Sequence, residues 1–369
     1  MLNDTELRVF RKSLLAWFRR FQRDLPWRRD KDAYRVWLSE IMLQQTRVAA
    51  VIPYYERFLA SFPTVTALAE APTEEVLRLW SGLGYYSRAR NLQRAAQQIV
   101  AKHAGRFPEG EDEARALPGI GAYTAAAILS IAFEQKHAVL DGNVARVLAR
   151  LFALRGDLRE PARWQKLQRS ADELLERKAP GDWNQAMMEL GATICTPRAP
   201  QCLLCPVAKH CAGRKQGIQG EIPEKRKKRA PVSVTLAAAV FVNPQGRTLL
   251  LPPPRPGTGE ITAAHIPTLV SKMWHFPTVA VTSDPHGELE QHLKREFALE
   301  ERRTLGLVAL TRVRHCVTYR QITIYAFRVS VAKLPLVDGT KAVALDDLAS
   351  VPISNLTRKI GRTAIASAP

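Results

Sequence analysis

The chain has 369 residues, too many for one small domain and comfortable for two. Hydrophobic residues make up 46% and charged residues 24%, a globular balance that excludes a disordered or fibrous protein. The 54 lysines and arginines exceed the 35 aspartates and glutamates, which gives a net charge of +19. This excess indicates nucleic acid as a partner, with a merely solvated basic surface as the alternative.

The sequence carries no segment typical of secretion or of membrane insertion. No apolar run approaches the length of a membrane span, and residues 1–10 carry charges throughout. We therefore expect a cytoplasmic protein, associated with the nucleoid if the source is bacterial.

The first half of the chain has the apolar spacing of amphipathic helices. In residues 7–18 the apolar positions share one helical face: Leu7, Phe10, Leu14, Leu15 and Phe18. The same spacing predicts helices over 34–43, 48–62, 74–80, 87–102, 122–133, 144–152, 164–177 and 183–194. Proline and glycine turns separate them. We predict an all-α domain over residues 1–213.

The pattern changes after Cys211. Residues 214–231 have few apolar side chains and contain five consecutive basic residues at 225–229. Such a run is typical of a solvated linker, and a strap that contacts phosphates is the alternative. From Val232 apolar and polar side chains alternate as in a strand, so we predict a separate α+β domain over 232–360. Further strands are predicted over 305–313 and 322–329, a loop over 252–259, a helix over 288–297 and a frayed end over 363–369.

Four of the five cysteines fall within seventeen residues: Cys195, Cys202, Cys205 and Cys211. Prolines at 197, 200 and 206 keep this segment out of a helix, so it must be a wrapped loop with little core of its own. Four thiolates around a metal centre would cross-link such a loop. Tetrahedral zinc and a [4Fe–4S] cluster both accept four cysteines, and generic chemistry leaves the two open. The fifth, Cys316, is expected in a strand.

A Leu-Pro-Gly-Ile-Gly turn precedes the apolar helix predicted at 122–133. Gly119 and Gly121 let the backbone turn tightly and let an anion approach, and the next helix begins with unpaired N–H groups. The segment can therefore hold a DNA phosphate, although an ordinary helix–helix turn uses the same residues. Asp141, about twenty residues further on, is by itself most simply the N-cap of a helix.

Glu40 stands beside Ile41, Met42 and Leu43 on an otherwise apolar helix. A carboxylate on such a face is either a partly solvated edge residue or a group with a chemical role. The residues around it leave both interpretations open.

Taken together, these segments resemble a known family. The cysteine spacing resembles the [4Fe–4S] loop of the endonuclease III-like DNA glycosylases, and the glycine turn resembles their helix–hairpin–helix motif, which a catalytic aspartate follows. Residues 37–46, 82–91 and 183–191 resemble the adenine DNA glycosylases, the MutY family. The resemblance runs nearly continuously over residues 5–211.

The resemblance implies a mainly α glycosylase domain with a [4Fe–4S] cluster, followed by a Nudix-like α+β domain. It implies a monomeric enzyme of base excision repair that flips adenine, mispaired with 8-oxoguanine or guanine, out of duplex DNA and hydrolyses its N-glycosidic bond. Relatives with lyase activity carry a nucleophilic lysine at the position of Tyr123, so a monofunctional reaction is implied. The alternatives are a lyase-type glycosylase for pyrimidine lesions and a non-catalytic DNA-binding protein.

The resemblance also assigns roles to single residues. Glu40 would protonate N7 of adenine and Asp141 would stabilise the cationic sugar, while Tyr123 and Asn143 position Asp141 and water. Further contacts are implied: Trp27 and Leu43 packing on the flipped base, Arg28 and Gln185 at its edge, Gln45 and Tyr85 as wedges in the duplex, and Arg23, Arg88 and Arg90 at phosphates.

The C-terminal domain carries a weaker resemblance. Met-Trp-His-Phe-Pro at 273–277 resembles the Trp-x-Phe-Pro element of the domain that reads 8-oxoguanine opposite the adenine. The hydrolytic Nudix box is not intact, because Gly287 replaces an upstream glutamate and the Glu-Glu pair at 300–301 falls one position late. The domain is therefore expected to bind and not to cleave. Thr318, in a loose match at 317–319, would lie in the lesion-reading loop.

Overall fold

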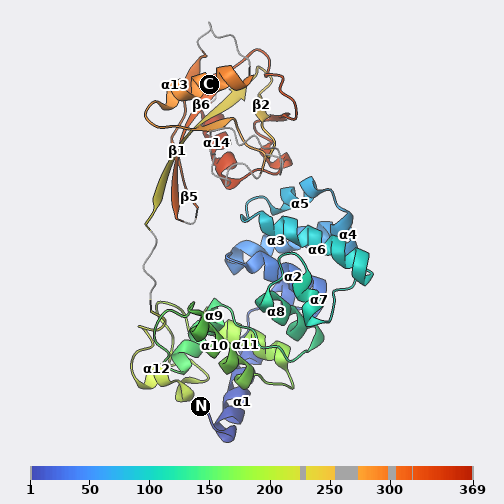
Figure 1. The fold of residues 1–369 in the computed structure, drawn as a ribbon, viewed down its shortest axis with the longest axis vertical. Helices are drawn as coiled ribbons and strands as arrows, with labels where there is room; N and C mark the ends of the chain where they lie inside the picture. Colours follow the sequence, from blue (N-terminus) through green and yellow to red (C-terminus); the bar gives the residue numbers. More distant parts are fainter. Residues whose placement is uncertain (1, 225–229, 254–272, 298–304, 318, 368–369) are drawn as a thin grey trace. The chain divides into compact units, whose positions relative to one another are not determined.

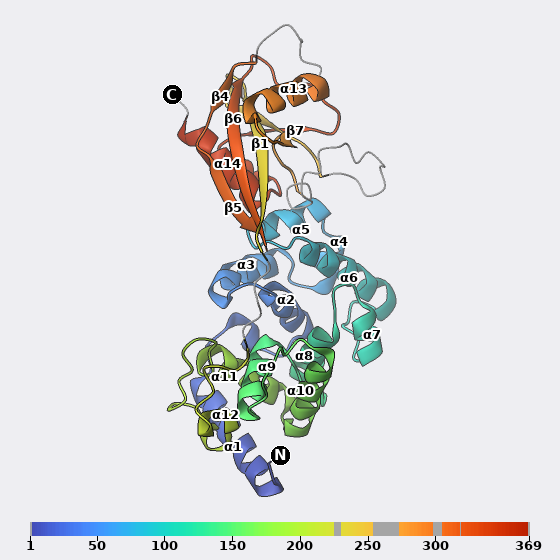
Figure 2. The ribbon, with the colours of Figure 1, turned by 60° about the vertical axis from the view of Figure 1, so that its left-hand side comes forward.

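The structure is a computed structural model that describes residues 2–224, 230–253, 273–297, 305–317 and 319–367. It has two compact units, drawn in Figures 1 and 2. The first comprises Met1–Ala71 and Arg90–Lys227, and the second comprises Pro72–Ala89 and Lys228–Pro369. Nothing in the sequence pattern anticipates that Pro72–Ala89 groups with the C-terminal residues. The basic run at 225–229 lies outside the described residues.

The first unit is helical, which confirms the predicted class of the N-terminal half. Its elements are α1 (Asp4–Phe21), η1 (Pro26–Arg28), α2 (Ala33–Leu43), α3 (Val48–Ser61), α4 (Val65–Glu70), most of α6 (Ser87–His103), α7 (Glu111–Ala116), α8 (Ala122–Phe133), α9 (Gly142–Leu151), α10 (Pro161–Leu174), α11 (Pro180–Thr193), η2 (Ala208–His210) and α12 (Ala212–Lys215). The short helices α4, α7 and α12 were not predicted, because six residues or fewer carry no readable apolar period.

Capping fixes where the long helices begin. Asn3 and Glu6 form a capping box at α1, with each side chain accepting the other's backbone N–H at 2.9 Å. Asp32 caps α2, which is buried on nearly every side and packs against α3 and α8. Helix α11 packs against α1, α8 and α9. The apolar run around Glu40 is therefore a core helix, and the carboxylate lies inside the unit.

The second unit is built on a mixed sheet, which confirms the predicted α+β class of the C-terminal region. Strands β3 (Thr278–Ala280), β1 (Val232–Val242), β6 (Arg320–Ser330) and β4 (Leu307–Ala309) follow one another in this order, and β5 (Val313–Val317) also pairs with β6. The central β1–β6 pair is parallel and the other pairs are antiparallel. Strands β2 (Arg247–Leu250) and β7 (Lys341–Ala344) form a separate antiparallel pair.

Helices cover both faces of this sheet (Figure 2). Helix α13 (Pro285–Phe297) packs Leu289 and Leu293 on the face that holds Phe241. Helix α14 (Asn355–Ala366) packs Leu356 and Ile360 on the opposite face. Alternate residues of β1 enter the two cores, so the strand is buried on both sides. Helix α5 (Thr73–Trp80) and the turn η3 (Leu348–Ser350) complete the unit.

Two predictions for the C-terminal part were wrong. Residues 305–313 form no single strand, because β4 and β5 pair with different parts of β6, at 327–329 and at 320–324. The chain end does not fray from residue 363, because α14 continues to Ala366 and buries Ala364 in the core. Cys316 lies in β5, as expected. Among the helices of the described residues, none has the length and apolar character needed to cross a membrane.

Candidate active site

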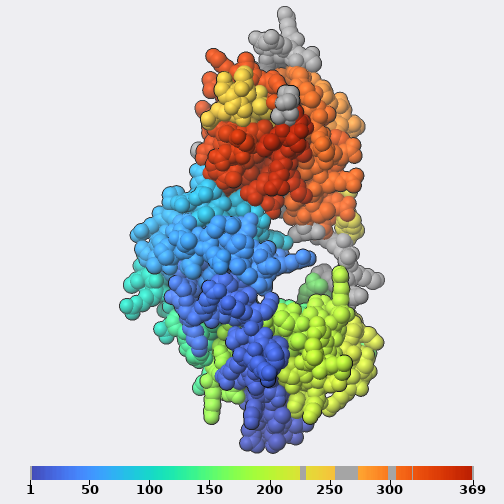
Figure 3. All heavy atoms as spheres, turned by 180° about the vertical axis from the view of Figure 1, so that it is seen from behind, coloured from blue at the N-terminus to red at the C-terminus, as the bar shows by residue number. Residues whose placement is uncertain are grey.

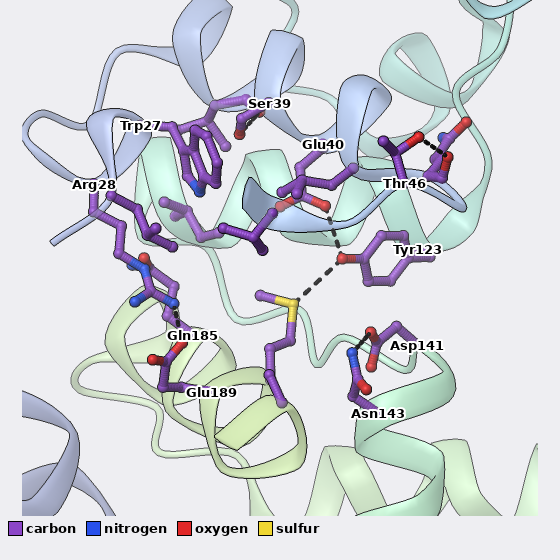
Figure 4. Close-up of a pocket in the computed structure, with 18 of the residues that line it drawn as sticks. Trp27, Arg28, Ser39, Glu40, Thr46, Tyr123, Asp141, Asn143, Gln185 and Glu189 are labelled. Carbon is purple, nitrogen blue, oxygen red and sulfur yellow. Dashed lines mark hydrogen bonds and ion pairs between the residues drawn. The ribbon is translucent and has the colours of Figure 1, made fainter. Parts of the chain in front are cut away.

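A pocket of about 640 Å³ opens in the first unit, within the size range of small-molecule sites. Helices α2, α8, α9 and α11 and the turn η1 provide its walls (Figure 4). In the space-filling view a hollow lies between the blue N-terminal helices and the yellow-green residues of the same unit (Figure 3). The pocket brings together many residues that the sequence predicted: Arg23, Trp27, Arg28, Glu40, Leu43, Gln45, Tyr123, Asp141, Asn143 and Gln185.

Glu40 is a buried acid with one hydroxyl partner in the pocket. It is 7% exposed, and the Tyr123 hydroxyl donates to its Oε2 at 2.7 Å (Figure 4). Burial raises the pKa of Glu40 to about 7, the hydrogen bond from Tyr123 opposes this rise, and the charge of Asp141 adds to it. The Glu40 carboxyl therefore keeps its proton in a substantial fraction of molecules at neutral pH.

Asp141 is both the N-cap of α9 and a wall of the pocket. Its Oδ1 accepts the N–H of Val144 at 2.7 Å, and its Oδ2 accepts the side-chain amide of Asn143 at 3.0 Å. Burial raises the pKa of Asp141, while these hydrogen bonds and the charge of Arg146 lower it. The two interpretations of Asp141 from the sequence are thus compatible, since the cap fixes the direction of the carboxylate.

A glycine allows α11 to approach this corner. A Cβ atom added at Gly191 would lie 2.7 Å from the Cβ of Asn143, so no larger residue fits without displacing the backbone. Asn143 is also held from the far side, because its Oδ1 accepts from Arg146 at 2.9 Å. The partner of Asp141 is therefore fixed on two sides.

Glu189 on α11 belongs to the pocket and was not predicted. Its side chain is fully buried and binds two arginines, with Arg23 Nε 2.7 Å from Oε1 and Arg28 Nη2 2.9 Å from Oε2. Burial acts to raise the pKa of Glu189, but the two guanidinium groups lower it below its ordinary value. The sequence signal is the one that marks Glu40, an acid in an apolar run, because Glu189 stands beside Met188 and Leu190.

This ion-pair cluster gives Arg23 a different position from the predicted one. The family resemblance implied a phosphate contact for Arg23, yet its guanidinium lies against Glu189 in the pocket wall. Arg28 also packs over the ring of Phe18, 5.4 Å from its centroid. Both arginines are therefore oriented by side chains of their own unit.

The base-packing and wedge residues occupy different settings. Trp27 is buried and packs edge-on against Tyr55, with ring centroids 5.4 Å apart. Gln45 follows α2 with a φ of 58°, and Tyr85 has a φ of 50°, so both predicted wedges hold a left-handed backbone that costs energy. Tyr85 is 45% exposed and belongs to the second unit, not to the pocket wall. Thr318 lies outside the described residues.

Arg88, which was predicted to contact a DNA phosphate, does not lie on the surface. Arg88 is 9% exposed, and its guanidinium lies 5.4 Å from the ring centroids of both Trp80 and Tyr85. Arg90 is half-buried, and burial lowers its pKa. The Arg88 side chain therefore supports the loop and does not project from it.

The glycine turn before α8 needs its first glycine. Gly119 has a φ of 83°, and a Cβ atom there would lie 2.9 Å from the Cβ of Asn91. Gly121 caps α8, and a Cβ atom there would meet nothing within 4 Å. The backbone beside the helix N-terminus is therefore open to a close approach.

The four clustered cysteines line one small cavity beside Arg150. This arginine is 1% exposed and donates to the Cys195 Sγ at 3.3 Å and to the carbonyl of Thr196 at 2.7 Å. No three histidine, cysteine or acidic side chains of the described residues are arranged to hold a single metal ion. The thiols instead share a cavity next to a fixed positive charge.

The fold of the first unit matches known repair proteins. Residues 38–174 match the HhH-GPD superfamily of base excision DNA repair proteins. A thermostable thymine-DNA glycosylase superimposes with a TM-score of 0.53 and 29% identity, covering 58% of this chain and 98% of that one. Endonuclease III in a trapped covalent complex with DNA superimposes with a TM-score of 0.50 and 22% identity, covering 59% and 100%. The first unit therefore has the fold of this superfamily.

Sequence relatives that match most of the chain identify its family within this superfamily. Human adenine DNA glycosylase is 38% identical over 363 residues, which cover 84% of this chain and 64% of that protein. The mouse adenine DNA glycosylase is 37% identical over 359 residues, covering 84% and 67%. The chain belongs to the adenine DNA glycosylase family. It spans about 64% of the length of the human relative.

Proposed function

We propose that this protein is a monofunctional DNA glycosylase that hydrolyses the N-glycosidic bond of adenine mispaired in duplex DNA. The observation that carries the proposal is the juxtaposition of Glu40, Tyr123 and Asp141 in one pocket of a size that suits a purine. The net charge of +19 and the open backbone at Gly121 favour a polyanionic duplex. We further propose that the protein acts as a monomer in the cytoplasm.

The two carboxyl groups divide the reaction between them. Adenine is a poor leaving group as an anion, and a proton on N7 makes it neutral. Glu40, protonated in part at neutral pH, supplies that proton. Asp141, held by α9 and Asn143, faces the positive charge that develops on the sugar. Water then forms a bond to the cationic sugar carbon and releases a proton, which balances the proton that Glu40 gave to adenine.

The absence of an amine distinguishes this reaction from that of a lyase. Lyase-type glycosylases use an amine nucleophile, and no lysine is found among the described residues that line the pocket. Tyr123 fills the corresponding position and is tied to Glu40. A bifunctional enzyme for pyrimidine lesions is the alternative. An amine of such an enzyme would form an imine intermediate with the sugar, and borohydride would trap that intermediate.

Recognition of the base that lies opposite the adenine is a separate part of the proposal. We propose that the C-terminal α+β region is a Nudix-like domain that binds 8-oxoguanine opposite the adenine. Trp274 bridges to Ile353 in the core next to α14, and Gly287 replaces the acid that hydrolysis would need. If Thr318→Ala leaves the preference for 8-oxoguanine over guanine unchanged, this assignment of the reading loop is wrong.

We also propose that Cys195, Cys202, Cys205 and Cys211 hold a [4Fe–4S] cluster. The shared cavity and the adjacent Arg150 fit a polynuclear anionic centre, and the spacing of six, two and five residues supports it. When bound, the cluster cross-links a segment that has little apolar core of its own.

One assay tests the proposed function. Purified protein is incubated with a duplex containing a single adenine opposite 8-oxoguanine, and free adenine is measured by chromatography. Release of adenine, without a species trapped by borohydride, is the expected result. No release from this duplex or from an adenine–guanine duplex would refute the function, and a trapped adduct would favour the bifunctional alternative.

A further inference from the structure

The loop at residues 81–87, which presents Tyr85, is fastened to the start of α14 within the second unit. Ser81 Oγ donates to the carbonyl of Ile353 at 2.8 Å, and the Tyr86 hydroxyl reaches the same oxygen at 3.3 Å. Ser81 and Ile353 are both buried. One carbonyl just before α14 therefore holds both ends of the loop.

Two side chains of α14 hold the loop from the other side. The side-chain amide of Asn355 donates to the carbonyl of Gly82 at 3.0 Å. The guanidinium of Arg358 donates to Ser81 Oγ at 3.0 Å, so that hydroxyl bridges the helix and the carbonyl of Ile353. An ion pair between Lys341 and Glu74 adds a contact at the start of α5.

The loop needs such support because its backbone is strained. Gly82, Gly84 and Tyr85 have φ values of 106°, 79° and 50°. Left-handed conformations cost free energy, above all for a residue with a side chain, and persist where the surroundings hold them. The N-terminal end of α14 supplies part of that hold.

The strained turn gives Tyr85 a defined exposed position. Trp80 Nε1 and Arg88 Nη2 both donate to the carbonyl of Gly84, at 3.1 and 3.2 Å. The Arg88 guanidinium lies 5.4 Å from the centroid of the Tyr85 ring, which is 45% exposed. The ring is therefore supported from inside the unit and faces solvent.

We propose that Asn355 and Arg358 are positioning residues for Tyr85, so that the C-terminal helix sets the geometry of the loop that enters duplex DNA. The entry of Tyr85 into DNA rests on the proposed function, whereas the attachment of the loop to α14 does not. If the attachment and the entry into DNA are both correct, the C-terminal region that we assign to recognition of the opposite base also positions Tyr85, a residue that contacts the duplex.

Amide hydrogen exchange tests the attachment without DNA. The full chain carrying Asn355→Ala and Arg358→Ala is compared with Arg362→Ala, an exposed arginine one turn further along α14. Because two hydrogen bonds are lost, exchange in residues 82–87 should rise about tenfold or more in the double variant and stay unchanged in the control. Unchanged exchange in the double variant would overturn the attachment. If the double variant melts earlier as a whole, the single Asn355→Ala, which removes an exposed side chain, takes its place.

A double-mutant cycle tests the link to DNA. Duplex affinity is measured by fluorescence anisotropy for Tyr85→Ala, for the α14 double variant and for their combination. If α14 acts through Tyr85, the combination should bind no more weakly than Tyr85→Ala alone. Losses that add would overturn the positioning role. Adenine release by the unmutated protein is measured in parallel, so failure of the proposed function is recognised separately.

Discussion

The Tyr123 hydroxyl lies 2.7 Å from Oε2 of Glu40, a buried carboxyl whose pKa is raised to about 7. Tyr123 keeps its own proton, because burial and the neighbouring carboxylates raise its pKa well above the ordinary value. The tyrosine therefore donates to the acid and does not replace it. This pair joins α2 to α8 and influences the pKa of the proton donor in the proposed reaction.

Removal of the acid should stop catalysis and spare binding. We expect Glu40→Gln to lower the single-turnover rate of adenine release by a factor of about 10²–10⁴, the usual contribution of a general acid. Affinity for the mismatched duplex should stay within about twofold, since the side chain keeps its shape. The control is Glu56→Gln, which changes an exposed acid on α3. A rate near that of the unmutated protein would contradict the role of Glu40.

The same substitution should stabilise the protein at alkaline pH. A carboxyl whose pKa rises from 4.5 unfolded to about 7 folded contributes stability below pH 4.5, and this contribution is lost as the pH rises through 7. Glu40→Gln should therefore raise the free energy of unfolding on the order of 2–3 kcal/mol at pH 8 and change it little at pH 4. Denaturant titrations at the two pH values measure this difference. Equal effects at both would exclude the raised pKa.

Tyr123→Phe should move the pH dependence of excision. The hydrogen bond from Tyr123 lowers the pKa of Glu40, so its removal should raise that pKa further. The acid would then stay protonated to higher pH, and the alkaline fall in the single-turnover rate should shift upward by about half a unit or more. A shift to lower pH would mean that Tyr123 does not act through Glu40.

Asp141 can be separated into its capping and catalytic roles. Asparagine caps a helix about as well as aspartate, so Asp141→Asn should change the free energy of unfolding by less than about 0.5 kcal/mol, and Asp141→Ala should lower it by about 1 kcal/mol. Both variants should lose excision by a factor of about 10² or more, because neither carries the negative charge. Thermal unfolding and single-turnover assays on the same samples distinguish the roles. Activity retained in Asp141→Asn would reduce Asp141 to a cap.

The buried Glu189 should matter for stability as well as for the pocket. Glu189→Gln leaves two guanidinium groups beside a neutral amide, and breaking such a pair costs about 3 kcal/mol. Because the pKa of Glu189 is lower in the folded protein, its contribution is present above about pH 4.5 and is lost as the pH falls. The variant should therefore lose most stability at neutral pH. Equal stability of variant and parent at pH 7 would contradict the ion-pair cluster.

Much of the site is readable from the sequence because its parts are local. The cap at Asp141 and the turn at Gly119 depend on neighbours within a few residues, and both appear where the pattern placed them. Glu40 is unusual as an acid in an apolar helix, and the family resemblance assigned its role. Glu189 has the same signature, yet its partners Arg23 and Arg28 lie more than 160 residues away in the chain.

The amino-acid order by itself determined the helical class of the first half, the cysteine spacing and the cap at Asp141, because helix period, capping and turn chemistry act over short stretches, and the family resemblance assigned the roles of Glu40 and Asp141. Tertiary packing alone decided that Arg88 turns inward, that β4 and β5 are separate strands, and that α14 holds the loop of Tyr85. These features depend on which surfaces pack together. Burial of apolar area drives that packing, and it acts between residues whatever their separation along the chain.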